Sequence, residues 1–151
     1  MKPNELDLDR YLPYLINRIG SSVAAAFAAD IAEEKITISM WRVLAALYHA
    51  GEQKQIDLAR LTSIVESTLS RVVSALHQRN LVAKARSEKS GRELSIDLTD
   101  EGRKLSKRFI PLALKYQILI THNVSEKDLE VVRRCLRQFY ENLRSRPPHA
   151  R

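Results

Sequence analysis

The chain has 151 residues, of which 44% are hydrophobic and 28% are charged, values typical of one globular domain with its own core. They exclude a disordered segment, and no apolar run approaches the roughly 20 residues that span a bilayer. The net charge of +7 favours an acidic partner. A lone cysteine, Cys135, excludes an internal disulfide. Since the first residues also lack the apolar stretch of a signal peptide, we expect a cytoplasmic protein.

The first predicted helix runs from about Asp9 to Ala32. Apolar side chains recur along it at helical spacing, at Leu12, Leu15, Ile16, Ile19, Val23, Phe27 and Ile31. The helix is longer than a small core requires, so we expect part of it to pack on a second subunit. For the next helix we predict Ser39 as N-cap, with Ile38 stapled to Val43, and Gly51 as its end.

Residues 55–61 and 65–79 are predicted to form two helices joined by a turn at Thr62-Ser63, with Asn80 as the left-handed cap that ends the second helix. This spacing is typical of a helix-turn-helix, whose second helix enters a DNA groove. In that second helix the apolar residues share one face: Leu69, Val72, Val73 and Leu76. The opposite face has hydroxyls, an arginine and an amide, with no acid: Ser67, Arg71, Ser74 and Gln78. A basic or polar face of this kind can lie in a DNA groove.

We therefore predict that DNA is contacted by five residues of this reading helix: Ser67, Thr68, Ser70, Arg71 and Ser74. Hydroxyls reach base edges, and arginine reaches guanine or phosphate. The first turn also presents backbone N–H groups to phosphate. Other interpretations stay open: Ser67 and Ser70 as ordinary helix caps, and Arg71 as one partner of a surface ion pair.

A basic hairpin is predicted next, from strands at residues 81–87 and 92–99 with Ser90-Gly91 in the turn. The second strand alternates apolar and polar residues, as expected for one buried face. Residues 54–92 carry eight Lys/Arg and three acids, a net +5, so the remaining residues carry only +2. We predict further DNA contacts from the wing and from the supporting helix, at Arg86, Lys89 and Arg92 and at Lys54 and Gln55. Simple solvation of these side chains is the alternative.

Two long helices complete the predicted order. Thr99 is expected to cap the first of them, which Pro111 should kink, and Ser125 the second, over residues 126–145. The last helix is predicted to bury Leu129, Val132, Leu136, Phe139 and Leu143. Such end helices need a partner to cover their apolar sides, and a twofold dimer is the simplest solution. The sequence thus predicts a mainly α fold with a small β-hairpin wing, a winged helix-turn-helix that dimerises through its N- and C-terminal helices.

Five segments of the chain resemble the MarR (multiple-antibiotic-resistance regulator) family: Met40–Leu47, Asp57–Ala59, Ser67–Val73, Leu81-Val82 and Leu98–Gly102. The resemblance covers roughly Ile36–Leu105, and the outer helices agree in length and order. It differs at the wing tip, where Ser90-Gly91-Arg92 lacks the family's usual aspartate, and at Val65-Glu66, where an acid followed by a basic or polar residue is usual.

The resemblance implies a triangular homodimer that binds palindromic operators, represses transcription and, in many members, releases DNA on binding a small aromatic or anionic ligand. It divides the single domain 1–151 into a DNA-binding region at about 36–99 and dimerisation helices at about 6–35 and 100–146. Others in the family respond to oxidation. Here a buried, inert thiol at Cys135 is the alternative to a sensor.

Five residues are candidates for a ligand pocket: Tyr11, Arg18, Ser22, Trp41 and Tyr116. Arg18 would pair with a carboxylate, whereas a plain surface arginine is the alternative. Trp41 is better explained by a place in the core than by a ligand platform. The four histidines show no metal-ligand spacing, and neither a phosphate loop nor a nucleophile motif is present, so we expect no metal, no cofactor and no enzyme activity.

The sequence therefore predicts a dimeric, ligand-responsive transcriptional repressor that binds double-stranded DNA at a pseudo-palindromic operator. Two other hypotheses use the same residues. One is an architectural DNA binder without sequence preference, and the other is a winged-helix module that binds only protein.

Overall fold

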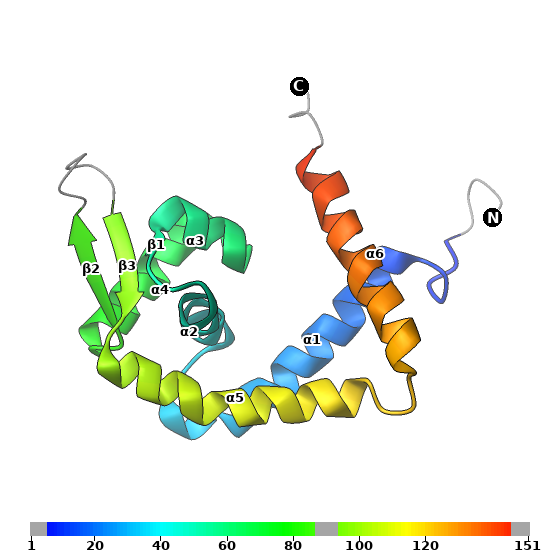
Figure 1. Cartoon of the computed structure of the whole chain (residues 1–151), viewed down its shortest axis with the longest axis horizontal. Helices are drawn as coiled ribbons and strands as arrows, with labels where there is room; N and C mark the ends of the chain where they lie inside the picture. The colour runs from blue at the N-terminus through cyan, green and yellow to red at the C-terminus, as the bar shows by residue number, and fades with distance from the viewer. Residues whose placement is uncertain (1–5, 87–93, 146–151) are drawn as a thin grey trace. The chain divides into compact units, whose positions relative to one another are not determined.

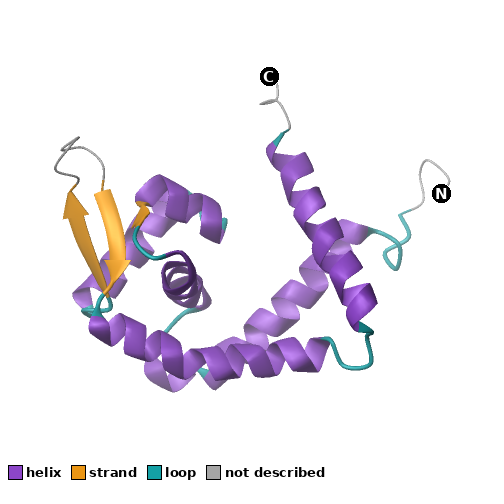
Figure 2. Ribbon diagram, viewed as in Figure 1, coloured by secondary structure: helices purple, strands orange, loops and turns teal. Residues whose placement is uncertain are grey.

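The computed structural model describes residues 6–86 and 94–145 of the chain. These residues form two compact units, Met1–Leu114 and Lys115–Arg151. Helices dominate both units (Figure 2). None of the helices in the described part of the chain is long and apolar enough to cross a membrane.

The elements follow the predicted order (Figure 1). The helices are α1 (Leu12–Asp30), a short 3-10 turn η1 (Ala32–Glu34), α2 (Ile38–Ala50), α3 (Gln55–Thr62), α4 (Glu66–Gln78), α5 (Asp100–Ile120) and α6 (Glu126–Arg144). The strands are β1 (Gln53–Lys54), β2 (Val82–Arg86) and β3 (Leu94–Leu98). This arrangement is a winged helix-turn-helix followed by two long helices, so the predicted fold class is confirmed.

The small sheet is antiparallel, with strand order β1-β3-β2. In the hairpin Val82 lies opposite Leu98 and Arg86 opposite Leu94, while Gln53 of β1 pairs with Ile96 on the other edge of β3. The sequence analysis did not predict β1, because two residues are too short to show the alternation of a strand.

The core of the first unit is made by α2, α3, α4 and the inner face of β3. Figure 1 shows α2 nearly end-on, with α3, the sheet and the first half of α5 arranged around it. The fully buried side chains come from all of these elements, among them Leu44, Leu47, Leu58, Leu69, Leu76 and Ile96. Burying each such side chain contributes about 1.5–3 kcal/mol, so this core fixes α4 in place.

An aromatic cluster joins α1, α2 and α5. The Trp41 ring stacks on Phe27 with centroids 5.4 Å apart and meets the edge of Phe109 at 5.8 Å. Phe27 and Phe109 are buried, and Trp41 is half-buried. Aromatic pairs of this geometry contribute about 0.5–1.5 kcal/mol beyond their buried area. The core interpretation of Trp41 therefore agrees with its surroundings.

Two predicted helix starts were wrong by a few residues. The N-cap of α2 is Thr37, whose Oγ1 accepts a hydrogen bond from the Met40 amide at 3.2 Å, and Ser39 lies inside the helix. Since Ile38 is already helical, it is not the residue before the cap, as a staple onto Val43 requires. The first helix begins at Leu12 rather than at Asp9, because Pro13, the next residue, favours the first turn of a helix.

Several predicted ends were confirmed. Gly51 follows α2 with φ of 72°, a value that favours glycine. Asn80 has φ of 54°, and the amides of Asn80 and Leu81 donate to the carbonyls of His77 and Leu76, which forms a Schellman motif at the end of α4. The Thr99 hydroxyl accepts from the Gly102 amide at 3.0 Å and so caps α5.

The first turn of α5 packs directly on backbone. A Cβ placed on Gly102 would lie 1.9 Å from the carbonyl oxygen of Leu81. The Thr99 hydroxyl also donates to the Asn80 carbonyl at 2.6 Å. Glycine at this position therefore allows α5 to approach the chain where it leaves α4.

The second unit contains the end of α5 and all of α6. Ser125 caps α6 as predicted, accepting from the Asp128 amide at 3.2 Å. The burial predicted along α6, for which a partner was required, is not achieved within the single chain: Leu129 is half-buried, and Val132, Leu136, Phe139 and Leu143 are exposed. In the first unit, the start of α1 likewise leaves Leu12, Ile16 and Ile19 exposed. The apolar residues have helical spacing but no cover within the described residues of one chain.

Candidate nucleic-acid interface

The reading helix α4 has two distinct sides. Leu69, Val73 and Leu76 are buried in the core, with exposed fractions of 0%, 1% and 0%. Ser67, Thr68, Ser70 and Arg71 are all exposed, and Ser74 is half-buried. The structure thus brings the five predicted α4 residues to one helix and leaves four of them exposed to solvent.

These polar groups have no partners among the residues that the structure describes. Neither the hydroxyls of Ser67, Thr68 and Ser70 nor the guanidinium of Arg71 makes a hydrogen bond or ion pair there. The two alternatives weighed from the sequence, helix capping by the serines and an ion pair at Arg71, are not observed within this part of the chain. The face is consequently available for base edges and phosphates.

The turn before α4 and the residues after it set its position. Ser63 has φ of 53°, and the Ile64 amide donates back to Ala59 at 3.2 Å, which reverses the chain tightly between α3 and α4. At the other end, the Arg79 guanidinium donates to the carbonyls of Lys35 at 2.7 Å and Glu34 at 2.9 Å. Hydrogen bonds to neighbouring segments therefore hold both ends of the reading helix in position.

Arg79 is a residue that sequence reasoning misjudged. It was counted only as part of the basic excess, yet its charge-assisted bonds hold the segment between α1 and α2 to the end of α4. The Glu34 carboxylate of the same segment pairs with Arg108 on α5. No short-range pattern indicates contacts between residues more than 40 positions apart, so the sequence held no signal for this role.

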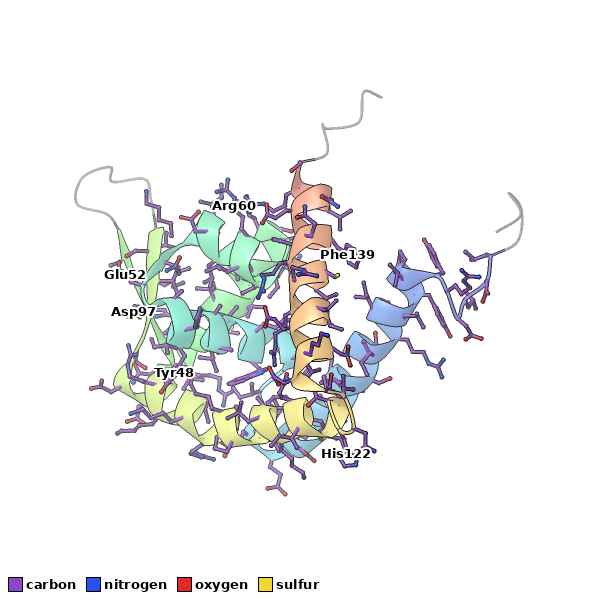
Figure 3. The ribbon with its side chains drawn as sticks, turned by 45° about the vertical axis from the view of Figure 1, so that its right-hand side comes forward. Tyr48, Glu52, Arg60, Asp97, His122 and Phe139 are labelled. Atoms are coloured by element: carbon purple, nitrogen blue, oxygen red, sulfur yellow. The ribbon has the colours of Figure 1, made fainter. Side chains whose placement is uncertain are left out.

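Three other cations of this unit are paired with acids. Arg60 on α3 pairs with Asp57 at 3.3 Å, and Arg103 lies 3.9 Å from Asp97 on β3 (Figure 3 labels Arg60 and Asp97). Lys104 donates to Glu101 at 2.8 Å, and this hydrogen bond raises the pKa of the Lys104 ammonium. Arg71 differs from these residues, since it is exposed and makes no ion pair with any described residue.

The remaining DNA-contact predictions lie on the start of α3 and on the wing. Lys54 is exposed at the N-cap of α3, and Gln55 is half-buried as its first residue. Arg86 ends β2, opposite Leu94. Lys89 and Arg92 lie outside the described residues, so their predicted contacts stay predictions.

The ligand candidates are spread over three helices. Arg18 and Ser22 are exposed one turn apart on α1, where the Ser22 hydroxyl donates to the Arg18 carbonyl at 2.9 Å, and Tyr11 is exposed at the N-cap. Phe27, which stacks on Trp41, lies about half a turn around α1 from Arg18. Within one chain Trp41 and Arg18 are thus on different sides of α1. Tyr116 belongs to the second unit and is half-buried.

Comparison with known proteins shows which family this chain resembles. The sequence profile of the MarR family matches residues 36–94, from the segment before α2 to the start of β3. The HTH-type transcriptional repressor Rv2887 of Mycobacterium tuberculosis is 30% identical over 100 residues, which are 66% of this chain and 72% of that protein. This chain belongs to the MarR family. Members of the family are DNA-binding transcription regulators rather than enzymes, and dimerisation is typical of them.

Solved MarR structures agree with the fold over nearly the whole chain. A MarR family transcriptional regulator from Silicibacter pomeroyi is 27% identical, with a TM-score of 0.85 over 94% of this chain and 97% of that one. The structure of Bordetella bronchiseptica BpsR, described with regulation of its DNA binding by 6-hydroxynicotinic acid, is 24% identical, with a TM-score of 0.75 over 85% of this chain and 97% of that one. The latter likeness shows the fold alone.

Proposed function

We propose that this MarR family protein is a sequence-specific repressor that binds a pseudo-palindromic operator as a homodimer. The observation that carries the proposal is the exposed side of α4, where three hydroxyls and Arg71 make no bond to any described residue. A face of hydroxyls and one guanidinium suits the donor and acceptor pattern of the major groove. Lys54 and Gln55 would then meet phosphates, and the wing residues Arg86, Lys89 and Arg92 the adjacent backbone or minor groove.

The apolar residues left exposed support the homodimer. Leu12, Ile16 and Ile19 follow one side of α1, and Val132, Leu136, Phe139 and Leu143 follow one side of α6. Large exposed apolar patches mark interaction surfaces. A twofold dimer covers them with identical surfaces and carries two reading helices to two half-sites about one turn of DNA apart.

Repression and release by a ligand extend the proposal. The mycobacterial relative is named a repressor, and BpsR is described with regulation by 6-hydroxynicotinic acid, an aromatic acid. A small aromatic or anionic effector would meet Tyr11, Arg18, Ser22, Trp41 or Tyr116, with Arg18 suited to a carboxylate. A thermal-shift screen of aromatic acids, repeated as a test of release from DNA, identifies such an effector because binding to the folded state raises the melting temperature.

Binding-site selection from a random duplex pool tests the proposal. The wild-type protein should enrich a short inverted repeat and keep it in the presence of competitor DNA. Arg71→Ala should weaken binding to that repeat by about 1–3 kcal/mol and relax the preference at one position of each half-site. Arg42 is an exposed arginine on α2, so Arg42→Ala removes the same charge away from the reading face and is the matched control.

Each alternative hypothesis predicts a different result. Binding without an enriched sequence would support the architectural DNA binder. Failure to bind any duplex at low ionic strength would support the protein-interaction module. Equal losses for Arg71→Ala and Arg42→Ala would show that only net charge matters, and would remove Arg71 from the reading face.

A further inference from the structure

The residue that opens the reading helix is apolar and exposed. Val65 is the N-cap of α4, and 73% of its surface is exposed. We propose that Val65 is a specificity-determining residue that packs against the 5-methyl group of a thymine in the major groove. This inference rests on the proposed function, because it assigns one base preference to the same α4 interface.

Among the helices that the structure describes, α2, α5 and α6 start with a capping hydroxyl, whereas α1, α3 and α4 start without one. Thr37, Thr99 and Ser125 cap α2, α5 and α6, and each hydroxyl accepts a backbone amide of the first turn. Val65 makes no side-chain cap bond. Serine, threonine, asparagine and aspartate stabilise this position, and valine does not. The start of α4 therefore lacks the stabilisation that a capping hydroxyl gives α2, α5 and α6.

The position of Val65 suits contact with bases. It lies two residues before the exposed Ser67, and the N-terminal residues of a reading helix are those that meet base edges. The next residue, Glu66, is an exposed carboxylate. A carboxylate beside phosphates is repelled, so this turn is better placed over base edges than over the backbone.

The chemistry of valine matches one base. In the major groove only thymine presents a methyl group, and apolar side chains contact it. Valine is branched at Cβ, so its rotamer is largely fixed before binding and little entropy is lost in the contact. A lone exposed valine is common on protein surfaces. The assignment therefore depends on the high exposure of Val65 and on its place at the start of the reading face.

Replacing thymine by deoxyuridine tests the contact, because it removes the methyl group and leaves base pairing unchanged. The probe is the duplex selected by the wild-type protein, with each thymine replaced in turn by dU. We expect one thymine in each half-site whose replacement weakens wild-type binding by about fourfold, the effect of roughly one buried carbon. With Val65→Ser the thymine and dU duplexes should bind equally.

The variants separate loss of the contact from loss of structure. Val65→Ser introduces a capping hydroxyl, so its melting temperature should be equal to or above that of the wild type. Val65→Thr keeps one methyl group and should retain part of the thymine preference. Val124→Ser is the matched control, since it makes the same change at another exposed valine outside the reading helix and should leave the preference intact. Thr68→Ser removes the other exposed methyl group at the start of α4 and so separates Thr68 from Val65 as the source of the contact.

The outcomes are distinct. If no thymine shows a dependence on its methyl group, or if the dependence survives Val65→Ser, the inference is wrong. If Thr68→Ser abolishes it, the contact belongs to Thr68 and the assignment to Val65 is wrong. If the wild type enriches no sequence at all, the proposed function fails together with this inference, whereas enrichment without methyl dependence contradicts the inference alone.

Discussion

The helices α4 and α6 are both amphipathic, but opposite sides of them are left without partners. In α4 the apolar residues Leu69, Val73 and Leu76 are buried, and the polar side has no bonds to described residues. In α6 the polar side is paired with itself: Arg133 bonds Glu126 at 2.5 Å and Arg137 bonds Glu130 at 3.2 Å. The apolar side of α6 is exposed, including Phe139 (Figure 3).

This contrast shows what each helix requires from outside. A helix with its apolar side buried and its polar side free is complete as a fold but open to a polar, charged partner. A helix with its polar side satisfied and its apolar side free lacks part of a core, and another apolar surface is what completes it. DNA suits the first case and a second copy of the chain the second.

The largest effect is expected from a charge placed on the apolar side of α6. Leu136 is 43% exposed in the single chain, and Leu136→Asp would bury a carboxylate in the proposed dimer interface. We expect a monomer by sedimentation and a loss of about 100-fold or more in affinity for the selected duplex. The reason is that two linked DNA-binding regions bind on the order of 10²–10⁴ times more tightly than one.

Gln138→Glu is the matched control for this charge. Gln138 lies on the polar side of α6, where its amide donates to Asn142 at 2.9 Å. The added charge should leave both the dimer and DNA binding intact. A Leu136→Asp protein that remains dimeric would show that the exposed apolar side of α6 is not the dimer interface.

A second prediction tests whether the fold depends on the close packing of α5 against the backbone that follows α4. Gly102→Ala places a Cβ against the Leu81 carbonyl, a backbone group directly after the α4 cap. The backbone must shift, so we expect a loss of about 3 kcal/mol in the free energy of unfolding measured with urea.

Gly20→Ala is its control within α1. A Cβ at Gly20 meets nothing within 4 Å, and alanine is the better helix former, so stability should rise by up to about 1 kcal/mol. Equal effects of the two substitutions would show that the close approach of α5 to Leu81 does not constrain the fold.

Much of the fold could be predicted because its signals are local. Helical spacing of apolar residues located every α-helix, and short capping signals located Gly51, Asn80, Thr99 and Ser125. The cap of α2 was misplaced by two residues, because Thr37 and Ser39 are both acceptable caps and only the fold selects between them.

The candidate site was predictable in part. The exposed side of α4 follows from the same periodicity, since residues opposite the core face must reach solvent. The contacts of Arg79 with Glu34 and Lys35 depend on how separate elements pack, and so does the close approach at Gly102. Periodicity identified the apolar side of α6, and the excess length of the end helices indicated that its cover comes from a partner, in agreement with its exposure in the single chain.

The smallest effect we predict also bears most directly on α4, because two measurements should change in opposite directions. Ser70 is exposed, and its hydroxyl makes no bond to the described residues. Ser70→Ala should therefore raise folding stability by a few tenths of a kcal/mol through helix propensity. If the hydroxyl contacts DNA, the same substitution lowers affinity for the selected duplex by about 1 kcal/mol.

Ser21→Ala on α1 should show the stability gain alone, since Ser21 is exposed outside the reading face. Chemical denaturation and duplex titration of both variants decide the matter: if Ser70→Ala binds the duplex as tightly as the wild type, the polar side of α4 at Ser70 is solvated rather than matched to DNA.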